Sequence, residues 1–266
     1  MKPISSFSRQ TGLSLIELMV AMLIGLFLIL GVTQIFISNQ SSYLFQQGQL
    51  GNQENGRFAL AILNQELLKA GYRSNLVSTL PADASLAGCN FPDGAAVVAV
   101  SSTSFCVQYQ TTNQLDLTCQ GTGLIAADRN AITTPYSTKG YENSTRPRIV
   151  EKIWFDATSS SITCTTSAGA QQMVTGVKDV RFEYGSGTKG SRTVTAFSAA
   201  PPAADMIGAV RYSVLMQSPG TARTRDTSTI APALQEWNTR YNTAYNDTVS
   251  IYQIVQGTTM IRNQMQ

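Results

Sequence analysis

The sequence predicts an α+β fold in which one long N-terminal helix packs on an antiparallel β-sheet domain. Three observations predict it. An uncharged apolar run covers residues 18–32, a helical pattern continues from it to about residue 70, and short strand-like runs follow from residue 71 onward. Because a membrane-length apolar helix cannot bury its whole surface in a small domain, we expect its first part to have a different environment from its second part.

The first part of the expected helix, Leu13–Ile37, is long enough to cross a membrane. Its 25 residues extend about 37 Å at about 1.5 Å per residue, and a bilayer core is about 30 Å thick. Glu17 is the one charged side chain in this part, and the next charge along the chain is Glu54. A lone carboxylate at membrane depth is costly and requires a partner.

The second part, residues 38–70, is expected to be amphipathic and to end at Gly71. Leu60, Leu63 and Leu67 line one face, as expected of a helix that packs on a domain. Glycine is unfavourable inside a helix by roughly 0.5–1 kcal/mol relative to alanine. We therefore expect the middle of the helix to be loosened at three positions, which are Gly48, Gly51 and Gly56.

Residues 71–266 are expected to form an exported, β-rich domain. Two hairpins are predicted, one from Phe105–Gln110 with Gln114–Cys119 and one from Ile149–Asp156 with Ser161–Thr166.

Further strands are predicted from alternating apolar residues. Residues 180–184 alternate apolar with charged side chains, which indicates a half-buried strand, and residues 210–216 alternate in the same way. Residues 252–262 provide a last strand or a pair of strands.

Three aromatic residues recur at every fourth position after Pro232. Trp237, Tyr241 and Tyr245 favour a short amphipathic helix that packs on the sheet. The alternative is a patch of aromatic side chains that faces a partner, since such residues are enriched in interfaces.

Composition excludes several classes of function. Charged residues make up 13% of the chain and the net charge is +3, which falls to +1 without Lys2 and Arg9. A nearly neutral chain gives no electrostatic basis for direct nucleic-acid binding. The chain has no histidine, so His-based catalytic triads and the commonest metal ligand are absent.

The four cysteines are Cys89, Cys106, Cys119 and Cys164, all in the expected exported domain. An even number in an oxidising compartment favours two disulfides. Of the three pairings, we favour Cys89–Cys106 with Cys119–Cys164, because the last two end strand-like runs that could lie side by side. One bridge with two buried free thiols is the alternative. The chain has no Cys-x-x-Cys spacing, so a zinc site is not expected.

The N-terminus combines basic residues, a glycine, an acid and the apolar run in a specific order. Lys2 and Arg9 precede Gly12, and Glu17 follows at the fifth position after it. A secretory signal would place its small cleavage residue after the apolar run, whereas here Gly12 lies before it. Cleavage at Gly12 would therefore leave the apolar segment on the mature protein.

This arrangement resembles the class III signal of type IV pilins. The resemblance implies a leader of residues 1–12, cleavage between Gly12 and Leu13 by a prepilin peptidase, and N-methylation of Leu13. It gives Glu17 an assembly role, in which it pairs with the free amine of a neighbouring subunit. Leu13 stands where the family usually has Phe, and Ser14 where it usually has Thr.

Later blocks resemble the PilW group of minor pilins. They are residues 53–60, residues 67–72, Val177–Tyr184, Val210–Leu215 and Thr258–Asn263. The resemblance implies a pilin-like fold, a single pass through the bacterial inner membrane with the C-terminal domain in the periplasm, and a place in the pilus.

Its implied function is pilus assembly in a priming or tip complex. The implied partners are other minor pilins, the major pilin and the inner-membrane assembly machinery. Twitching motility, adhesion or DNA uptake would depend on the protein indirectly. The same blocks are also similar to the J-type minor pseudopilin of type II secretion, which is the alternative function. A membrane-anchored enzyme or binding protein is a third hypothesis.

No catalytic residue, metal site or cofactor is expected. Asp179 and Glu183 are spaced as neighbours on the solvent face of a strand rather than as a catalytic pair. Residues 185–190 are rich in glycine but lack the spacing of a phosphate-binding loop.

Overall fold

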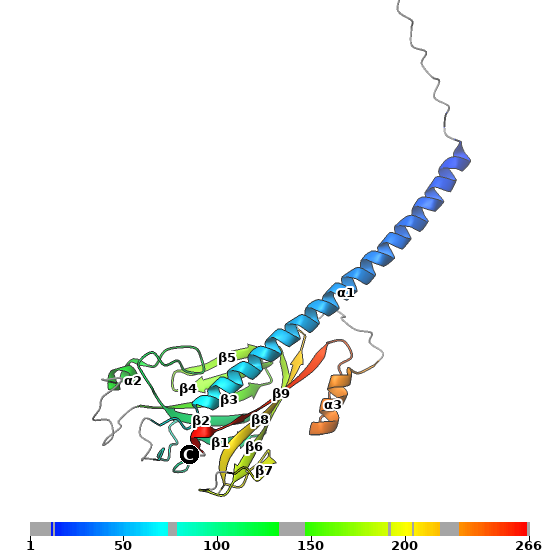
Figure 1. The fold of residues 1–266 in the computed structure, drawn as a ribbon. Helices are drawn as coiled ribbons and strands as arrows, with labels where there is room; N and C mark the ends of the chain where they lie inside the picture. Colours follow the sequence, from blue (N-terminus) through cyan, green and yellow to red (C-terminus); the bar gives the residue numbers. More distant parts are fainter. Residues whose placement is uncertain are drawn as a thin grey trace, which may run out of the picture. The chain divides into compact units, whose positions relative to one another are not determined.

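The structure is a computed structural model of the chain. It describes residues 12, 14–73, 79–132, 147–190, 193–203, 205–218 and 229–264. The chain divides into two units, residues 1–46 and residues 47–266, and each is described by itself. The class is α+β, with one long helix and antiparallel sheets (Figure 1).

The long helix α1 runs without interruption from Leu15 to Lys69. Gly71 follows it with a φ of +76°, a backbone conformation that glycine adopts at little cost. The expected loosening at the glycines is wrong, since the helix continues through all three of them.

Two of the helical glycines have a packing role instead. A Cβ atom at Gly56 would lie 2.8 Å from Cγ1 of Val255, and one at Gly48 would lie 3.1 Å from Cδ1 of Ile251. Only glycine therefore allows the helix backbone to come this close to the sheet. Gly51 has open space around it.

The first sheet has five antiparallel strands in the order β1-β2-β3-β4-β5. The sequence predicted the central pair, since β3 and β4 are the second expected hairpin. Its strands are β1 (Val97–Ser101), β2 (Ser104–Gln110), β3 (Arg148–Asp156), β4 (Ser161–Thr166) and β5 (Gly169–Thr175).

The first expected hairpin is wrong. Strand β2 pairs with β1 and β3, and Gln114–Cys119 contributes only an isolated bridge from Leu117 to Gly123. The side chain of Asp116 accepts hydrogen bonds from the backbone N–H groups of Thr112 (2.5 Å) and Asn113 (3.2 Å). These local bonds hold a turn and compete with strand pairing.

The second sheet has four antiparallel strands in the order β7-β6-β8-β9. The last expected strand or pair is one continuous strand, β9. The strands are β6 (Val177–Gly187), β7 (Ala196–Ser198), β8 (Met206–Gln217) and β9 (Tyr252–Met260). Two short helices, α2 (Ala126–Ala131) and α3 (Pro232–Tyr241), and the terminal 3₁₀ turn η1 (Arg262–Gln264) complete the fold.

One core joins both sheets and the C-terminal part of α1. Leu63 and Leu67 of the helix are fully buried in it, and the rings of Phe105 and Phe182 meet edge to face at 4.8 Å, one from each sheet. Strand β8 is buried on both faces, because a second cluster around Trp237 of α3 covers its Leu215. The alternation expected for residues 210–216 therefore holds for the apolar side, which lies in the core, whereas the opposite side is covered as well and the strand is not half-buried.

Two disulfides join the exported domain. They link Cys89 to Cys106, with Cα atoms 5.8 Å apart, and Cys119 to Cys164, with Cα atoms 6.2 Å apart. This is the pairing favoured from the sequence, although Cys119 does not end a strand as that argument assumed.

Candidate assembly site

The N-terminal end of α1 is exposed in the part of the chain that the structure describes. Gly12 is exposed, and no atom lies within 4 Å of the place where its Cβ would be. Glu17 is exposed and lies in the first turn of α1, where a negative charge interacts favourably with the helix dipole. Leu13, Lys2 and Arg9 lie outside the described residues.

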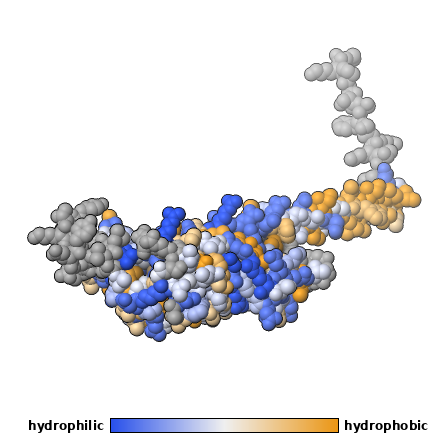
Figure 2. All heavy atoms as spheres, turned by 60° about the horizontal axis from the view of Figure 1, so that its bottom comes forward, coloured by the Kyte–Doolittle hydropathy of each residue, from blue (hydrophilic) through white to orange (hydrophobic). Residues whose placement is uncertain are grey.

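An uninterrupted apolar surface follows Glu17. The large apolar side chains between Leu15 and Ile37 are exposed by about half or more, and Figure 2 shows them as orange surface over the N-terminal part of α1. This part of α1 is long and apolar enough to cross a membrane. Its surface requires lipid or other apolar helices as a partner.

The part of α1 that packs on the sheets also has an uncovered apolar side. Leu50, Phe58 and Leu68 are exposed by 65%, 49% and 49%, while Leu63 is fully buried on the opposite side. The helix thus holds its own domain with one side and presents apolar side chains to solvent with the other. Such a side suits contact with another subunit.

The end of α1 is fixed to the first sheet through two buried carboxyl groups. Glu66 of the helix and Glu151 of β3 are 3% and 0% exposed. Glu151 Oε1 accepts hydrogen bonds from the Tyr109 hydroxyl at 2.9 Å and from the Cys119 N–H at 2.8 Å, and Lys69 pairs with Glu66.

Glu66 and Glu151 also interact with each other. Two carboxyl groups can share a hydrogen bond only if one of them is protonated. Burial, reinforced by the charge of Glu151, raises the pKa of Glu66 to about 7.

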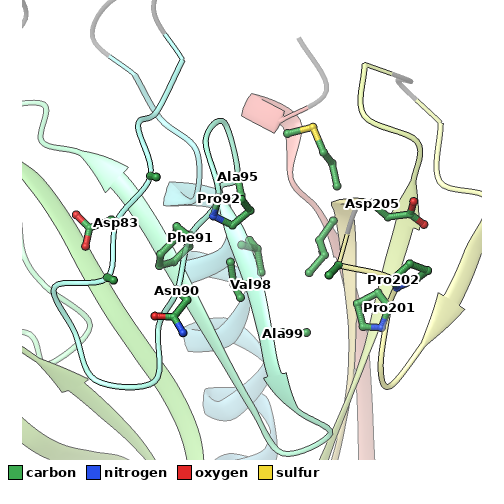
Figure 3. A pocket seen from close by; sticks show the side chains of 16 residues that line it. Asp83, Asn90, Phe91, Pro92, Ala95, Val98, Ala99, Pro201, Pro202 and Asp205 are labelled. Atoms are coloured by element: carbon green, nitrogen blue, oxygen red, sulfur yellow. The ribbon is translucent and has the colours of Figure 1, made fainter.

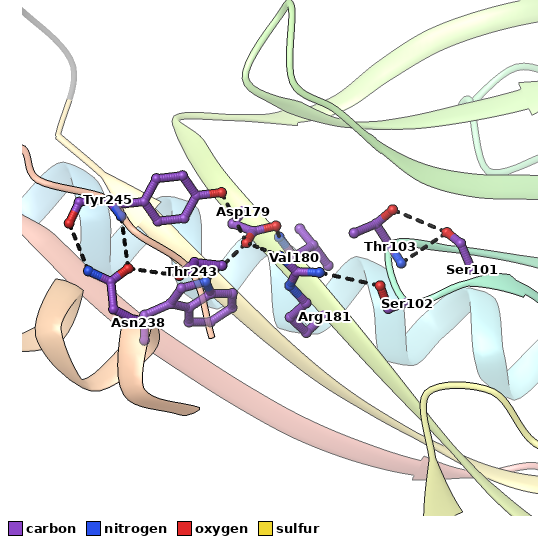
Figure 4. A network of polar contacts seen from close by, with 10 residues as sticks. Ser101, Ser102, Thr103, Asp179, Val180, Arg181, Asn238, Thr243 and Tyr245 are labelled. Carbon is purple, nitrogen blue, oxygen red and sulfur yellow. Dashed lines mark hydrogen bonds and ion pairs between the residues drawn. The ribbon is translucent and has the colours of Figure 1, made fainter. Parts of the chain in front are cut away.

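A second polar network fixes α3 to the second sheet (Figure 4). Asp179 Oδ2 accepts hydrogen bonds from Trp237 Nε1 at 3.0 Å and from the Tyr245 hydroxyl at 3.2 Å, and it pairs with Arg181 at 2.8 Å. Asn238 of α3 then bonds the backbone of Tyr245 through both ends of its amide.

The expectation that Asp179 lies on a solvent face is therefore wrong. Asp179 is 2% exposed, because it lies opposite Leu215 on the face of the sheet that α3 covers. Trp237 is fully buried, so its part in the alternative aromatic patch is also wrong. The helix that packs on the sheet is confirmed for Trp237 and Tyr241, whereas Tyr245 lies beyond its end. Pattern alone gave no sign that a distant segment covers this face.

Among the residues that the structure describes, no group of three or more His, Cys, Asp and Glu side chains is placed to hold a metal ion. The buried acids are engaged by Tyr109, Lys69, Trp237 and Arg181 instead.

Comparison with known families agrees with the N-terminal geometry. Residues 7–33 match the prokaryotic N-terminal methylation motif, which includes Gly12, Leu13 and Glu17. Residues 142–263 match the family described as type IV pilus-assembly protein W. The chain has the N-terminal motif of methylated pilins and is PilW-like in its C-terminal half. This PilW-like pilin has the features of a protein that is processed by prepilin peptidase, anchored in a membrane by its apolar helix and taken up by pilus assembly machinery.

The fold of the PilW-like pilin is also similar to that of a type IV-like pilin from Thermus thermophilus. The two structures superpose with a TM-score of 0.44 at 11% sequence identity, over 80% of this chain and 97% of the other. No curated protein sequence matches the chain.

Sequence reasoning missed the two buried acid networks of the PilW-like pilin, while its assignment of Gly12, Leu13 and Glu17 stays a prediction. Glu66 lies four residues after Ile62 and directly before Leu67, in a helical pattern that assigns it to an apolar face. An acid on the apolar face of a helix could have indicated this network, because a buried acid requires a hydrogen-bond or charge partner.

Proposed function

We propose that this chain acts without catalysis in a priming or tip complex of a type IV pilus, together with other minor pilins and the major pilin. Twitching motility, adhesion or DNA uptake would then depend on it indirectly. The protein would cross the bacterial inner membrane once, with residues 71–266 in the periplasm before it enters the pilus.

One observation carries this proposal. An exposed apolar segment, Leu15–Ile37, contains near its start a single carboxylate, Glu17, which lies five positions after the exposed Gly12. The described part of the chain offers no cover for this segment. Lipid covers it before assembly, and neighbouring helices cover it in a filament.

The charge on Glu17 makes assembly selective. In apolar surroundings its carboxylate is stabilised only by a positive partner. Cleavage after Gly12 frees the amine of residue 13, and the same amine on a neighbouring subunit is a positive group at the matching depth. A subunit out of register would leave both charges without a partner.

The first test is the intact mass of the mature chain from its native host. We expect a chain that begins at N-methylated Leu13. Intact mass is preferred because Arg57 is the first Lys or Arg after Arg9, so trypsin would leave one long apolar N-terminal peptide. A chain that begins at Met1, or that is cut after the apolar run, would contradict the proposal.

The second test replaces Glu17 with Ala in the host and counts surface pili. We expect the variant chain to accumulate in the membrane while pili are lost, because the pairing that admits the subunit is gone. Glu54→Ala is the matched control, since Glu54 is an exposed acid on the same helix outside the membrane-spanning part. Normal piliation with Glu17→Ala would show that the carboxylate has no role in assembly.

The family match favours a pilus over a type II secretion system, because residues 142–263 match a pilus-assembly family. Deletion of the gene separates the two functions. We expect loss of pili with normal protein secretion, and the opposite result would assign the chain to secretion.

A further inference from the structure

The exported domain contains a cavity of about 690 Å³ between the two sheets (Figure 3). One wall is strand β1 with Phe91, and the opposite wall is the segment that leads into β8, with Pro201, Pro202 and Ile207. Both walls are largely apolar. None of the assembly features described above uses this cavity.

The wall formed by β1 is a free strand edge, because β1 is the terminal strand of its sheet. Val97 lies opposite Val107, and the Gln108 N–H donates to the Ala96 carbonyl at 2.9 Å. Hydrogen-bonded and non-bonded pairs alternate along an antiparallel ladder. The next bonded pair is therefore Val98 with Cys106, and Val97 and Ala99 turn their N–H and C=O groups to the free edge.

No described residue bonds these outward groups of Val97 and Ala99. Val97 is 3% exposed, so its unbonded N–H and C=O groups lie away from bulk water. A buried donor or acceptor without a partner is unfavourable, and an added strand satisfies such groups. A lipid chain or an apolar small molecule could fill the cavity but could not bond a row of peptide groups.

The opposite edge of the same sheet has a different character. Strand β5 presents exposed Gln171 and Gln172 to solvent. No residue of β5 lines the apolar cavity, so a strand added at that edge would have no pocket there for its apolar side chains. The β1 edge combines unbonded backbone groups with an apolar cavity, which is the combination that recognises an extended peptide.

A carboxylate in the cavity adds a charge preference. Asp83 is neutralised by Arg148 at 3.1 Å, whereas Asp205 accepts a hydrogen bond from the Ser186 hydroxyl at 3.1 Å and is paired with no Lys or Arg among the described residues. A positive side chain on the incoming segment would complete this site.

We propose that the β1 edge receives an extended segment of a different pilin subunit, which adds as a strand beside β1. Its backbone bonds Val97 and Ala99, its apolar side chains enter the cavity, and a Lys or Arg reaches Asp205. This inference rests on the proposed function, because it takes the partner to be another subunit of the same organelle.

Photo-crosslinking of the full-length chain in its native host tests the proposal. The photoreactive residue p-benzoylphenylalanine replaces Asn90, an exposed residue that lines the cavity, and the matched control places it at Gln171 on the β5 edge. We expect an adduct from position 90 that maps by mass spectrometry to one contiguous segment of another pilin's exported domain, with a Lys or Arg in it.

Two variants then separate strand addition from chance proximity. Ala99→Pro removes an outward N–H but leaves the bonds to β2, as proline does on an edge strand, and we expect about a tenfold loss of adduct. Asp205→Asn keeps the shape of the cavity and removes its charge, and we expect a loss of several-fold even if Ala99→Pro perturbs the fold.

Several outcomes would overturn the docking proposal. The first is an adduct that neither variant weakens, or an equally strong adduct from position 171. The second is an adduct to lipid, to a second copy of this chain or to a protein that is not a pilin. The third is the absence of any adduct when the chain is processed and the cells carry pili. In this last case the docking proposal fails while the proposed function stands. The proposed function would instead be contradicted if the chain is not processed and deletion of its gene leaves pili intact.

Discussion

At the scale of single residues, two buried acids at the joint between helix and sheet give the domain a dependence on pH. Glu66 has an unfolded pKa near 4.5 and a folded pKa of about 7, because burial and the charge of Glu151 both disfavour its ionised form. The folded state therefore binds a proton that the unfolded state has already lost between these two values.

We predict that the domain loses stability as pH rises from about 4.5 to about 7, by on the order of 3 kcal/mol from this group, and no further above that range. Glu66→Gln should abolish this slope, because glutamine stays neutral at every pH. Chemical denaturation of both chains across pH measures it, with exposed Glu54→Gln as the control. Parallel curves for the wild type and Glu66→Gln would show that the pair shares no proton.

Asp179 supports the second prediction at this scale. Asp179→Ala would leave the buried donor of Trp237 without its acceptor, together with the partly buried donors of Tyr245 and Arg181. We expect a loss of about 2–5 kcal/mol in the free energy of unfolding. The control is Glu183→Ala, whose partly exposed pairs with Arg211 and Arg240 should contribute about 1 kcal/mol or less. Equal losses from both variants would contradict the anchoring role of Asp179.

The roles given to the N-terminal residues stay predictions, and each rests on a feature that has a physical meaning within a short stretch of chain. Charge, glycine, acid and apolar length lie within the first 37 residues and need no knowledge of distant contacts. Asp179 was not predictable, because its burial depends on Trp237, which is 58 residues away along the chain.

At the scale of elements, α1 shows why propensity misleads in the middle of a helix. The cost of a glycine is a local quantity, whereas the reason for Gly56 is its contact with Val255 of β9. The helix accepts the local cost because close approach buries its leucines more completely.

Two alanine substitutions should therefore have opposite effects. Gly51→Ala fills open space and should stabilise the chain by roughly 0.5–1 kcal/mol through helix propensity. Gly56→Ala places a methyl group 2.8 Å from Val255 and should destabilise it by about 1–3 kcal/mol. Denaturation of the full chain in detergent compares them. Stabilisation by both would mean that the helix does not need the close contact.

Strand prediction failed where side chains satisfy the backbone locally. Gln114–Cys119 has the composition of a strand, but Asn113 and Asp116 bond nearby N–H groups and close a turn. Strands β3 and β4 were predictable, since a tight connection brings them together and both carry apolar residues at alternating positions.

At the scale of the whole molecule, the disulfides connect segments that the sheets alone would not join. In the chain-entropy description, the bridge from Cys119 to Cys164 closes the longer loop, with a separation of 45 residues against 17 for Cys89 and Cys106.

We predict that removing the longer bridge by Cys119→Ser with Cys164→Ser costs about 4 kcal/mol, and removing the shorter one by Cys89→Ser with Cys106→Ser about 3 kcal/mol. Thermal unfolding of the full chain in detergent, with and without reductant, measures both. Unchanged midpoints under reductant would contradict a stabilising role for the bridges.

The two ends of residues 47–264 are bonded to each other. Asn52 donates to the Ile251 carbonyl at 2.9 Å, Thr259 donates to Asn64 at 2.8 Å, and Asn263 donates to the Ala70 carbonyl at 3.1 Å. Each contact spans more than 190 positions, so a long loop must be closed before it can form. The leucines of the helix therefore stay partly uncovered until the final residues of the chain are in place. A chain truncated before β9 would lack part of the surface that covers this helix, and we expect it to be degraded by proteases more readily than the full chain.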